Sequence, residues 1–273
     1  MDHPVVYLMY HEIELAGRAA VSADPGYLRY VVTAERFRAQ LARLRAENFR
    51  GLSVAEALDE DSASAQTAGP RVVLTFDDGC ETDLLTAAPA LAEVGYGATF
   101  YVTAGHVGRR GYLSAPQLRE LAARGFDVGC HSMTHRLLTD LPDDALRAEV
   151  VEAKARLEDL TGRRVANFSC PGGRWSRRVV EVAREAGYES VATSRVGANV
   201  AGADRFRLSR VAVMRATGLG EFARYCRGEG LWKRRALDGA LTLAKRALGN
   251  SAYQKFRTNL LGRGEGKAGG VRS

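Results

Sequence analysis

The segment Val72-Val73-Leu74-Thr75-Phe76-Asp77-Asp78-Gly79 carries the clearest information about the fold. Its first five residues form a short apolar run, which is typical of a strand buried in a parallel sheet. A helical pattern follows over residues 84–94 and ends at Gly95, and another apolar run follows over residues 98–102. This alternation of strand and helix predicts parallel βα units.

The same alternation extends over most of the chain. Thr33, Ser53 and Ser114 stand where helix caps are expected, and the last two begin capping-box patterns. Six or seven βα units result, so we predict an α/β fold of the parallel-barrel type. Further strands are expected at residues 5–10, 126–130, 165–169, 190–193 and 208–214, and further helices at 142–160 and 176–186.

Chemically versatile residues follow the ends of these predicted strands. His11, Asp77, Asp78, His131 and Pro171 each come directly after, or close to, the C-terminal end of one strand. In parallel barrels this end of the strands carries the active site. We therefore expect these five residues to lie near one another.

The neighbouring aspartates can divide two roles between them. On an ideal strand Asp77 and Asp78 would face opposite sides, but a bend eased by Gly79 lets both carboxylates converge. One carboxylate can bind a metal ion while the other accepts a proton from a water that the ion activates. We predict that Asp78 is the ligand and Asp77 the base.

His131 and His135 complete a candidate metal site. Their spacing of four predicts a helical turn with both imidazoles on one face. Alone, an Asp-Asp-Gly sequence is an ordinary turn and a His-x-x-x-His pair is a solvated helix face. Together with Asp78, the two histidines form a set that is typical of a catalytic Zn²⁺ site with an open position. The combination predicts a metal-dependent hydrolase.

Composition places few limits on this prediction. The 273 residues are 46% hydrophobic and 26% charged, as in ordinary globular proteins. The N-terminus shows no secretion signal, and no apolar run approaches the about 20 residues of a membrane span, so we expect a cytoplasmic protein. Without CxxC spacing, the four cysteines are expected to be reduced and buried: they are Cys80, Cys130, Cys170 and Cys226.

The basic charge is concentrated in a C-terminal segment. Residues 224–273 contain twelve Lys or Arg residues and three acidic residues. Residues 231–248 have apolar side chains at helical spacing, which fits either an interfacial amphipathic helix or a helix packed on the barrel. The first alternative predicts peripheral contact with the inner membrane face, and the absence of a recognised motif argues against nucleic acid binding. The expected domains are a barrel at 1–215, a basic helical extension at 216–261 and a disordered tail at 262–273.

Three motifs resemble those of the polysaccharide deacetylase family, also called the NodB-homology carbohydrate esterases. They are Thr75–Gly79, His131–His135 and the Cys170-Pro171-Gly172-Gly173 loop, and Met9-Tyr10-His11-Glu12-Ile13 is similar to the beginning of one branch. The resemblance covers roughly residues 4–215. It implies a distorted (β/α)₇ barrel, a first Asp that acts as base, and Zn²⁺ or a related ion held by the second Asp and two His. It also implies hydrolysis of a non-peptide carbon–nitrogen bond.

The third motif departs from the family pattern. Many members have Arg-x-Pro-Tyr where this chain has Ser169-Cys170-Pro171-Gly172. In the family the Tyr position gives its backbone N–H to the oxyanion, and Gly172 can still do so. The Arg that orients the base must come from elsewhere, and the candidates are Arg174 and Arg210. Arg210 resembles an Arg that this branch carries on a strand.

The expected general acid also comes from a different position. Many members use a C-terminal His, but here no His follows His135. His11, at a predicted strand end, is therefore the candidate acid, since imidazole titrates near neutral pH. The alternative is that His11 is a buried, hydrogen-bonded residue of the core with no catalytic role. Trp175 is the aromatic candidate for contact with a sugar ring, although it could equally be a core residue.

The resemblance implies removal of acetyl groups from N-acetylated amino sugars. The expected substrate is a polysaccharide, an oligosaccharide or a lipid-linked saccharide. One alternative is a metal-dependent amidase that acts on a non-sugar amide. Another is a catalytically inactive carbohydrate-binding protein, which the presence of Asp77, Asp78, His131 and His135 disfavours.

Overall fold

The structure is a computed structural model that describes residues 4–63, 69–232 and 234–236. The chain divides into two compact units, Met1–Glu229 and Gly230–Ser273. Every element below belongs to the first unit, including the helix at 219–226 that the sequence analysis assigned to the extension. Most of the helix expected at 231–248, and all of the tail at 262–273, lie outside the described residues.

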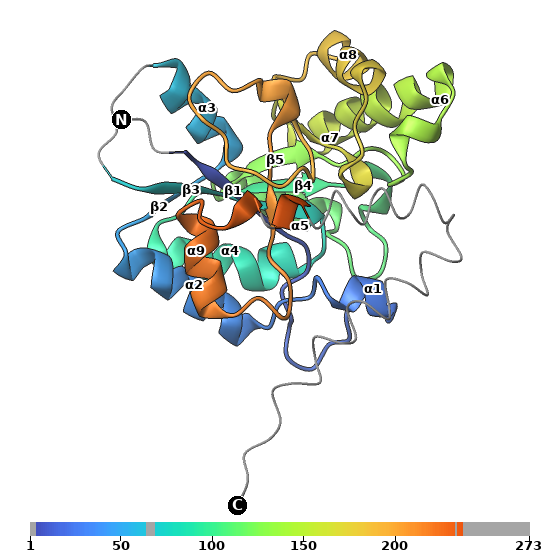
Figure 1. Cartoon of the computed structure of the whole chain (residues 1–273). Coiled ribbons are helices and arrows are strands. Elements are labelled where there is room, and N and C mark those ends of the chain that lie inside the picture. The colour runs from blue at the N-terminus through green and yellow to red at the C-terminus, as the bar shows by residue number, and fades with distance from the viewer. Residues whose placement is uncertain (1–3, 64–68, 233, 237–273) are drawn as a thin grey trace, which may run out of the picture. The chain divides into compact units, whose positions relative to one another are not determined.

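Parallel strands form the centre of this unit (Figure 1). They follow the order β7-β6-β5-β4-β3-β1-β8, with the short β2 beside the first half of β3. The sheet curls into a distorted (β/α)₇ barrel, so the predicted fold class is confirmed. The strands are β1 Val6–Tyr10, β2 Arg50–Leu52, β3 Arg71–Asp78, β4 Thr99–Val102, β5 Asp127–Cys130, β6 Asn167–Ser169, β7 Ser190–Ala192 and β8 Val211–Ala212.

The strands agree with the apolar runs of the sequence, with three differences. The strand β2 was not predicted, and the Asp pair forms the end of β3 instead of following it. The strand expected at 208–214 is reduced to two residues, so that Arg210 precedes β8. A single parallel bridge, Ala192 to Leu208, joins β7 to the segment before β8.

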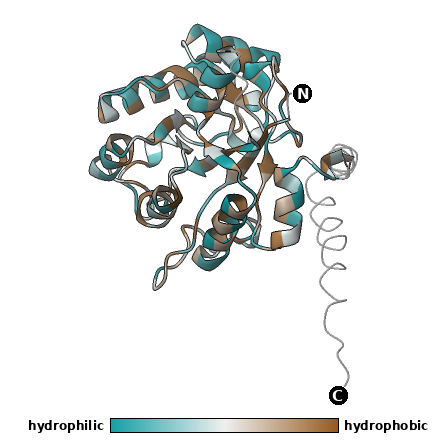
Figure 2. Cartoon of the chain, turned by 90° about the vertical axis from the view of Figure 1, so that its left-hand side faces the viewer, coloured by the Kyte–Doolittle hydropathy of each residue, from teal (hydrophilic) through white to brown (hydrophobic). Residues whose placement is uncertain are grey.

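Helices surround the strands, and the helical ribbons in Figure 2 mix hydrophilic and hydrophobic positions, as expected for helices with one buried face. The side chains of Thr33, Ser53 and Ser114 cap the three predicted helices, the last two in complete capping boxes. No helix among the described residues is long and apolar enough to cross a membrane. The helices are α1 Pro25–Leu28, α2 Ala34–Ala46, α3 Val54–Ser62, α4 Ala88–Val94, α5 Ala115–Ala123, α6 Asp143–Arg147, α7 Ala153–Thr161, α8 Arg177–Glu185 and α9 Leu219–Cys226.

Two of the predicted helices contain a wider π-helical turn. One lies at Asp83–Ala87, directly before α4, and the other at Ala148–Glu152, between α6 and α7. Such turns are rare and often occur near functional sites. The first follows the segment that carries Asp77 and Asp78, and the second contains Glu149, which bonds to the loop of His135 described below.

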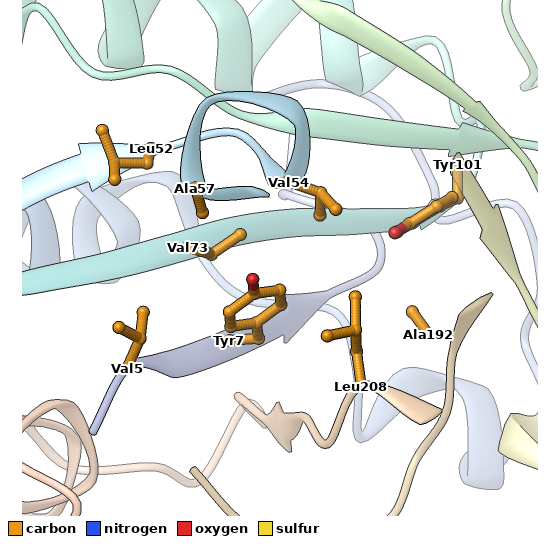
Figure 3. Close-up of a cluster of buried hydrophobic side chains, with 9 residues drawn as sticks. All are labelled: Val5, Tyr7, Leu52, Val54, Ala57, Val73, Tyr101, Ala192 and Leu208. Atoms are coloured by element: carbon orange, nitrogen blue, oxygen red, sulfur yellow. The ribbon is translucent and has the colours of Figure 1, made fainter. Parts of the chain in front are cut away.

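An apolar cluster fills part of the barrel (Figure 3). It brings together side chains from β1, β3, β4 and β7 with others from α3. Because side chains alternate along a strand, Val73 of β3 shares its face with Thr75 and Asp77. The alternation therefore places Asp77 on the cluster's side of the sheet. The cluster consists of Val5, Tyr7, Leu52, Val54, Ala57, Val73, Tyr101, Ala192 and Leu208.

A polar network joins the N-terminal ends of four strands. The Asp127 carboxylate accepts hydrogen bonds from the Thr99 hydroxyl at 2.6 Å and the Asn167 amide at 2.8 Å. Ser190 donates to Asn167 at 2.7 Å, and the backbone N–H of Val54 donates to Thr99 at 2.8 Å. Each of these four polar residues begins its strand. In barrels this end of the strands serves stability.

We expect Asp127→Ala to destabilise the protein without changing the site at the other end of the strands. The substitution leaves the buried donors of Thr99 and Asn167 without an acceptor, which costs about 1–3 kcal/mol for each group. Chemical denaturation measures this loss. Asp127→Asn keeps one acceptor oxygen and should cost less, and a variant as stable as the wild type would contradict the role of the network.

Candidate active site

Asp77 lies in a buried ion pair with Arg210. The Arg210 guanidinium donates two parallel hydrogen bonds to the carboxylate, at 2.7 Å to Oδ1 and 2.8 Å to Oδ2. Both side chains are almost completely buried. Bidentate geometry of this kind fixes the orientation of a carboxylate as well as its charge. Of the two candidate arginines, Arg210 is therefore the one that contacts Asp77.

Hydrogen bonds from three neighbouring segments hold Arg210 in place. Its Nη1 donates to the Thr75 hydroxyl at 3.2 Å, its Nη2 to the Ser169 hydroxyl at 2.8 Å, and its Nε to the Thr193 carbonyl at 2.9 Å. These contacts join β3, β6 and the residue after β7. A buried ion pair is tolerated when its remaining hydrogen-bonding groups are satisfied, as they are here.

The ion pair keeps the Asp77 carboxylate ionised. Burial alone would raise the pKa of Asp77, but the positive charge of Arg210 outweighs it, with contributions from His131 and His11. The net result is a pKa below the usual range of an aspartate. Asp77 is therefore a charged acceptor at neutral pH.

Asp78, His131 and His135 lie close enough together to bind one ion. One ligand atom from each residue lies within 4.8 Å of the other two, and no other such group of His, Cys, Asp or Glu occurs among the described residues. The Asp78 Oδ1 atom lies 3.6 Å from His131 Nε2 and 3.3 Å from His135 Nε2. Imidazole nitrogen and carboxylate oxygen are ligands that suit Zn²⁺. The donor set therefore fits a divalent metal ion.

The ring of His131 is neutral and held in one orientation. Burial lowers the pKa of His131 to about 4, so the ring is neutral at pH 7, as a ligand must be. Its Nδ1 atom lies 2.9 Å from the Ser169 carbonyl oxygen, a contact in which the ring nitrogen donates. This bond orients the ring, so that Nε2 faces Asp78. Ser169 thus contacts both Arg210 and a candidate ligand.

The backbone is unusual at this group. Four non-glycine residues in the described chain have a left-handed φ, and three belong to the site: Asp78 at 83°, Ser132 at 64° and His135 at 62°. Such conformations cost free energy and often occur at functional sites. At Asp78 the change of φ breaks the alternation of the strand, which lets the carboxylates of both Asp77 and Asp78 approach His131. Gly79 follows with a φ of 79°, so the bend includes both Asp78 and the glycine that the sequence analysis pointed to.

The predicted helical turn at His131–His135 is wrong. These residues form an irregular loop, in which the backbone N–H of His135 donates to the Ser132 hydroxyl at 3.0 Å. The spacing of four was a coincidence with helical periodicity. Positive φ values at both Ser132 and His135 turn the chain back, and this reversal brings the second imidazole to Asp78.

His11 lies near both aspartates but has no hydrogen bond of its own at Nδ1 among the described residues. Burial would raise the pKa of Asp78, but the hydrogen bond from His135 and the nearby imidazoles of His11 and His131 bring it below its usual range. The ring packs against Tyr30, with 4.6 Å between centroids. An unpartnered nitrogen argues against the alternative of a hydrogen-bonded core residue.

The loop after β6 contains the other predicted residues. Pro171 is buried, and Gly172 is exposed with a φ of 61°. Arg174 lies 4.0 Å from Asp140, an exposed pair, so it has no part in the ion pair of Asp77. Trp175 packs against Arg207, whose guanidinium lies 4.2 Å from the centroid of the indole ring.

The sequence analysis assigned no role to the side chains of Thr75, Ser169 and Glu149. The strand alternation could have indicated Thr75, because it lies two residues before Asp77. No pattern in the sequence pointed to the hydroxyl of Ser169 as a partner of Arg210. Glu149 is buried in the π-helical turn and bonds to the loop of His135, a contact that no local pattern could predict.

Comparison with known proteins agrees with this geometry. A sequence profile of the polysaccharide deacetylase family matches residues 64–191. The matched residues form a polysaccharide deacetylase domain, which is less than half of the 273-residue chain. Members of the family are hydrolases of non-peptide carbon–nitrogen bonds, so the predicted family and enzyme class are confirmed.

Individual relatives match different shares of this chain. YxkH of Bacillus subtilis strain 168, which carries the same family name, is 25% identical over 76% of this chain and 70% of its own length. A chitooligosaccharide deacetylase of Rhizobium leguminosarum bv. trifolii is 32% identical, over 44% of this chain and 54% of its own length. The structure of the deacetylase PplD of Streptococcus pyogenes shares the fold, with a TM-score of 0.73, 22% identity, and coverage of 82% of this chain and 98% of that one.

We expect Arg210→Lys to reduce activity far more than Arg174→Lys. Lysine keeps the charge but loses the two parallel hydrogen bonds to Asp77. Losing one charge-assisted bond costs about 1.5–3 kcal/mol, or roughly ten- to a hundredfold in kcat/KM. Steady-state kinetics on a hydrolysed substrate measures both variants. A larger loss in Arg174→Lys would contradict the assignment.

Proposed function

We propose that this polysaccharide deacetylase domain is a divalent-metal-dependent enzyme that removes acetyl groups from N-acetylated amino sugars. The observation that carries the proposal is the juxtaposition of the Asp78–His131–His135 group with the ionised, Arg-bound carboxylate of Asp77. Relatives that are named as deacetylases of chitooligosaccharides support the sugar substrate. The supported reaction is hydrolysis of an acetamide to acetate and an amine.

Asp78, His131 and His135 would hold the metal ion, and Zn²⁺ is the ion that this ligand set favours. When bound, such an ion polarises the acetyl carbonyl and activates the attacking water. His131 Nε2 lies 3.9 Å from Asp77 Oδ2, so the carboxylate lies at the edge of the ligand group. A base in this position can reach a water that enters beside the ligands.

Asp77 would act as the base. Its carboxylate accepts the proton of the water that attacks the carbonyl carbon, and Arg210 keeps the carboxylate in one orientation throughout. The backbone N–H of Gly172 would donate to the oxyanion that forms, and Pro171 would fix the turn that presents it. As the carbon–nitrogen bond breaks, His11 would protonate the leaving amine.

Substrate contacts beyond the acetamide would come from Arg174 and Trp175, which follow Gly173 in the same loop. A Trp side chain offers a flat apolar surface of the type that packs against sugar rings. The substrate would be a polysaccharide, an oligosaccharide or a lipid-linked saccharide. The basic segment after residue 224 would bring the enzyme to the inner membrane face in the last case.

Measurement of zinc content and acetate release, for the wild type and Asp77→Asn, tests the proposal. Asparagine cannot accept the proton, so we expect kcat to fall by about 10²–10⁴-fold. Zinc content should not change, because Asp77 is not a ligand. Asp159→Asn, at an exposed position of α7, is the matched control and should keep its activity.

Three outcomes separate the alternatives. Zinc binding with acetate release from N-acetylglucosamine oligomers supports the deacetylase. If zinc binds and these oligomers are not hydrolysed but small non-sugar amides are, the enzyme is the alternative amidase. A wild-type protein that binds no divalent metal would overturn the proposed mechanism.

A second variant tests the role of His11. We expect His11→Gln to slow acetate release from an amide by about 10²–10⁴-fold, because the amine leaves only when protonated. Hydrolysis of 4-nitrophenyl acetate should slow much less, since its leaving group needs no proton. Equal losses on both substrates would show that His11 is not the acid.

A further inference from the structure

The loop that carries both candidate histidine ligands, His131–His135, is held in an unfavourable backbone conformation. Ser132 and His135 both have positive φ values, at 64° and 62°. Neither residue is a glycine, so each pays a conformational cost that the surrounding structure must offset. Contacts on two sides of the loop supply this support.

The first support comes from the segment after β4. The backbone N–H groups of Ala104 and Gly105 donate to the carbonyl oxygens of Ser132 and Met133, at 3.0 and 2.8 Å. A Cβ atom on Gly105 would lie 2.5 Å from the Met133 carbonyl oxygen, so the two segments are in close backbone contact. These bonds fix the carbonyl groups of the loop but leave its N–H groups to other partners.

The second support is Glu149, which lies in the π-helical turn between α6 and α7. Its Oε2 atom accepts hydrogen bonds from the backbone N–H groups of Met133 at 3.0 Å and Thr134 at 2.8 Å. Its Oε1 atom accepts one from the Thr134 hydroxyl. The backbone carbonyl of Glu149 also accepts from Met133 N–H, at 3.0 Å. One buried residue therefore binds the loop directly before His135.

The carboxylate of Glu149 suits the hydrogen-bond donors of the loop. No Lys, Arg or His side chain within the described ranges lies within 4 Å of its carboxylate as an ion-pair partner, so the donors of the loop are its partners. Hydrogen bonds to a charged acceptor are about twice as strong as neutral ones. A carboxylate also accepts at both oxygens. The side-chain amide of a glutamine has only one acceptor oxygen, so its NH₂ group would face one of the loop's donors without forming a hydrogen bond.

We propose that Glu149 is a positioning residue for the metal site, which holds the strained His131–His135 loop so that His135 meets Asp78 before an ion binds. The inference rests on the proposed function, because it takes these residues as the metal ligands. Glu149 acts through the backbone N–H groups of Met133 and Thr134 and the Thr134 hydroxyl, and not through a hydrogen bond to either histidine ring. Removing such an outer partner typically reduces metal affinity about 10–100-fold.

Zinc affinity of the full chain, measured by competition with a chromophoric chelator, tests the proposal. We expect Glu149→Gln to bind Zn²⁺ about 10–100-fold more weakly than the wild type. The matched control is Glu152→Gln, an exposed residue of the same π-helical turn, which should bind as the wild type does. Equal affinities of Glu149→Gln and the wild type would overturn the proposal.

A second measurement separates positioning from a general loss of stability. In the metal-free protein, Glu149→Gln should speed hydrogen exchange of the Met133 and Thr134 amides while those of β3 stay protected. If Glu149→Gln fails to fold, or loses protection throughout, Glu149 is a general stability residue and the proposal is wrong. A wild type that binds no Zn²⁺ would instead refute the proposed metal site itself.

Discussion

The buried ion pair between Asp77 and Arg210 is the interaction on which the rest of the site depends. Removing two charges from water is costly, and the cost is offset only when the geometry is good and every donor is satisfied. Here the guanidinium bonds to Asp77, Thr75, Ser169 and the carbonyl of Thr193. It therefore joins β3, β6 and the end of β7 at the place where a single bridge, Ala192 to Leu208, connects the strands.

The two ends of the strands carry polar networks with different chemistry. At the N-terminal ends, Asp127 is surrounded by neutral donors, and burial raises its pKa. At the C-terminal ends, cationic neighbours lower the pKa of Asp77 although it is the more buried of the two. The same residue type is thus an acceptor for neutral donors at one end and, at the other, the proposed base, held as the charged partner of Arg210. This contrast follows from which partners the fold brings to each carboxylate.

The strained backbone around the candidate ligands is held by hydrogen bonds from neighbouring segments. Asp78, Ser132 and His135 adopt backbone conformations that non-glycine residues avoid, and the hydrogen bonds of Gly105 and Glu149 hold two of these three in one loop. A site that is already assembled loses less free energy when its ligand binds. The polysaccharide deacetylase domain would thereby present Asp78, His131 and His135 in a fixed arrangement beside its base.

Much of the fold and the residues of the candidate site could be predicted from the sequence alone, because these signals are local. Apolar runs and capping residues predicted most strands and the starts of α2, α3 and α5, and strand ends identified Asp77, Asp78, His131 and His11. Only the tertiary structure decided between Arg174 and Arg210, replaced the predicted helical turn at His131–His135 with a strained loop, and revealed Glu149. Asp77 and Arg210 are separated by 133 positions, and their pairing depends on how the barrel closes. Periodicity and capping report on neighbours along the chain, whereas the partners of a buried charge are set by packing between distant segments.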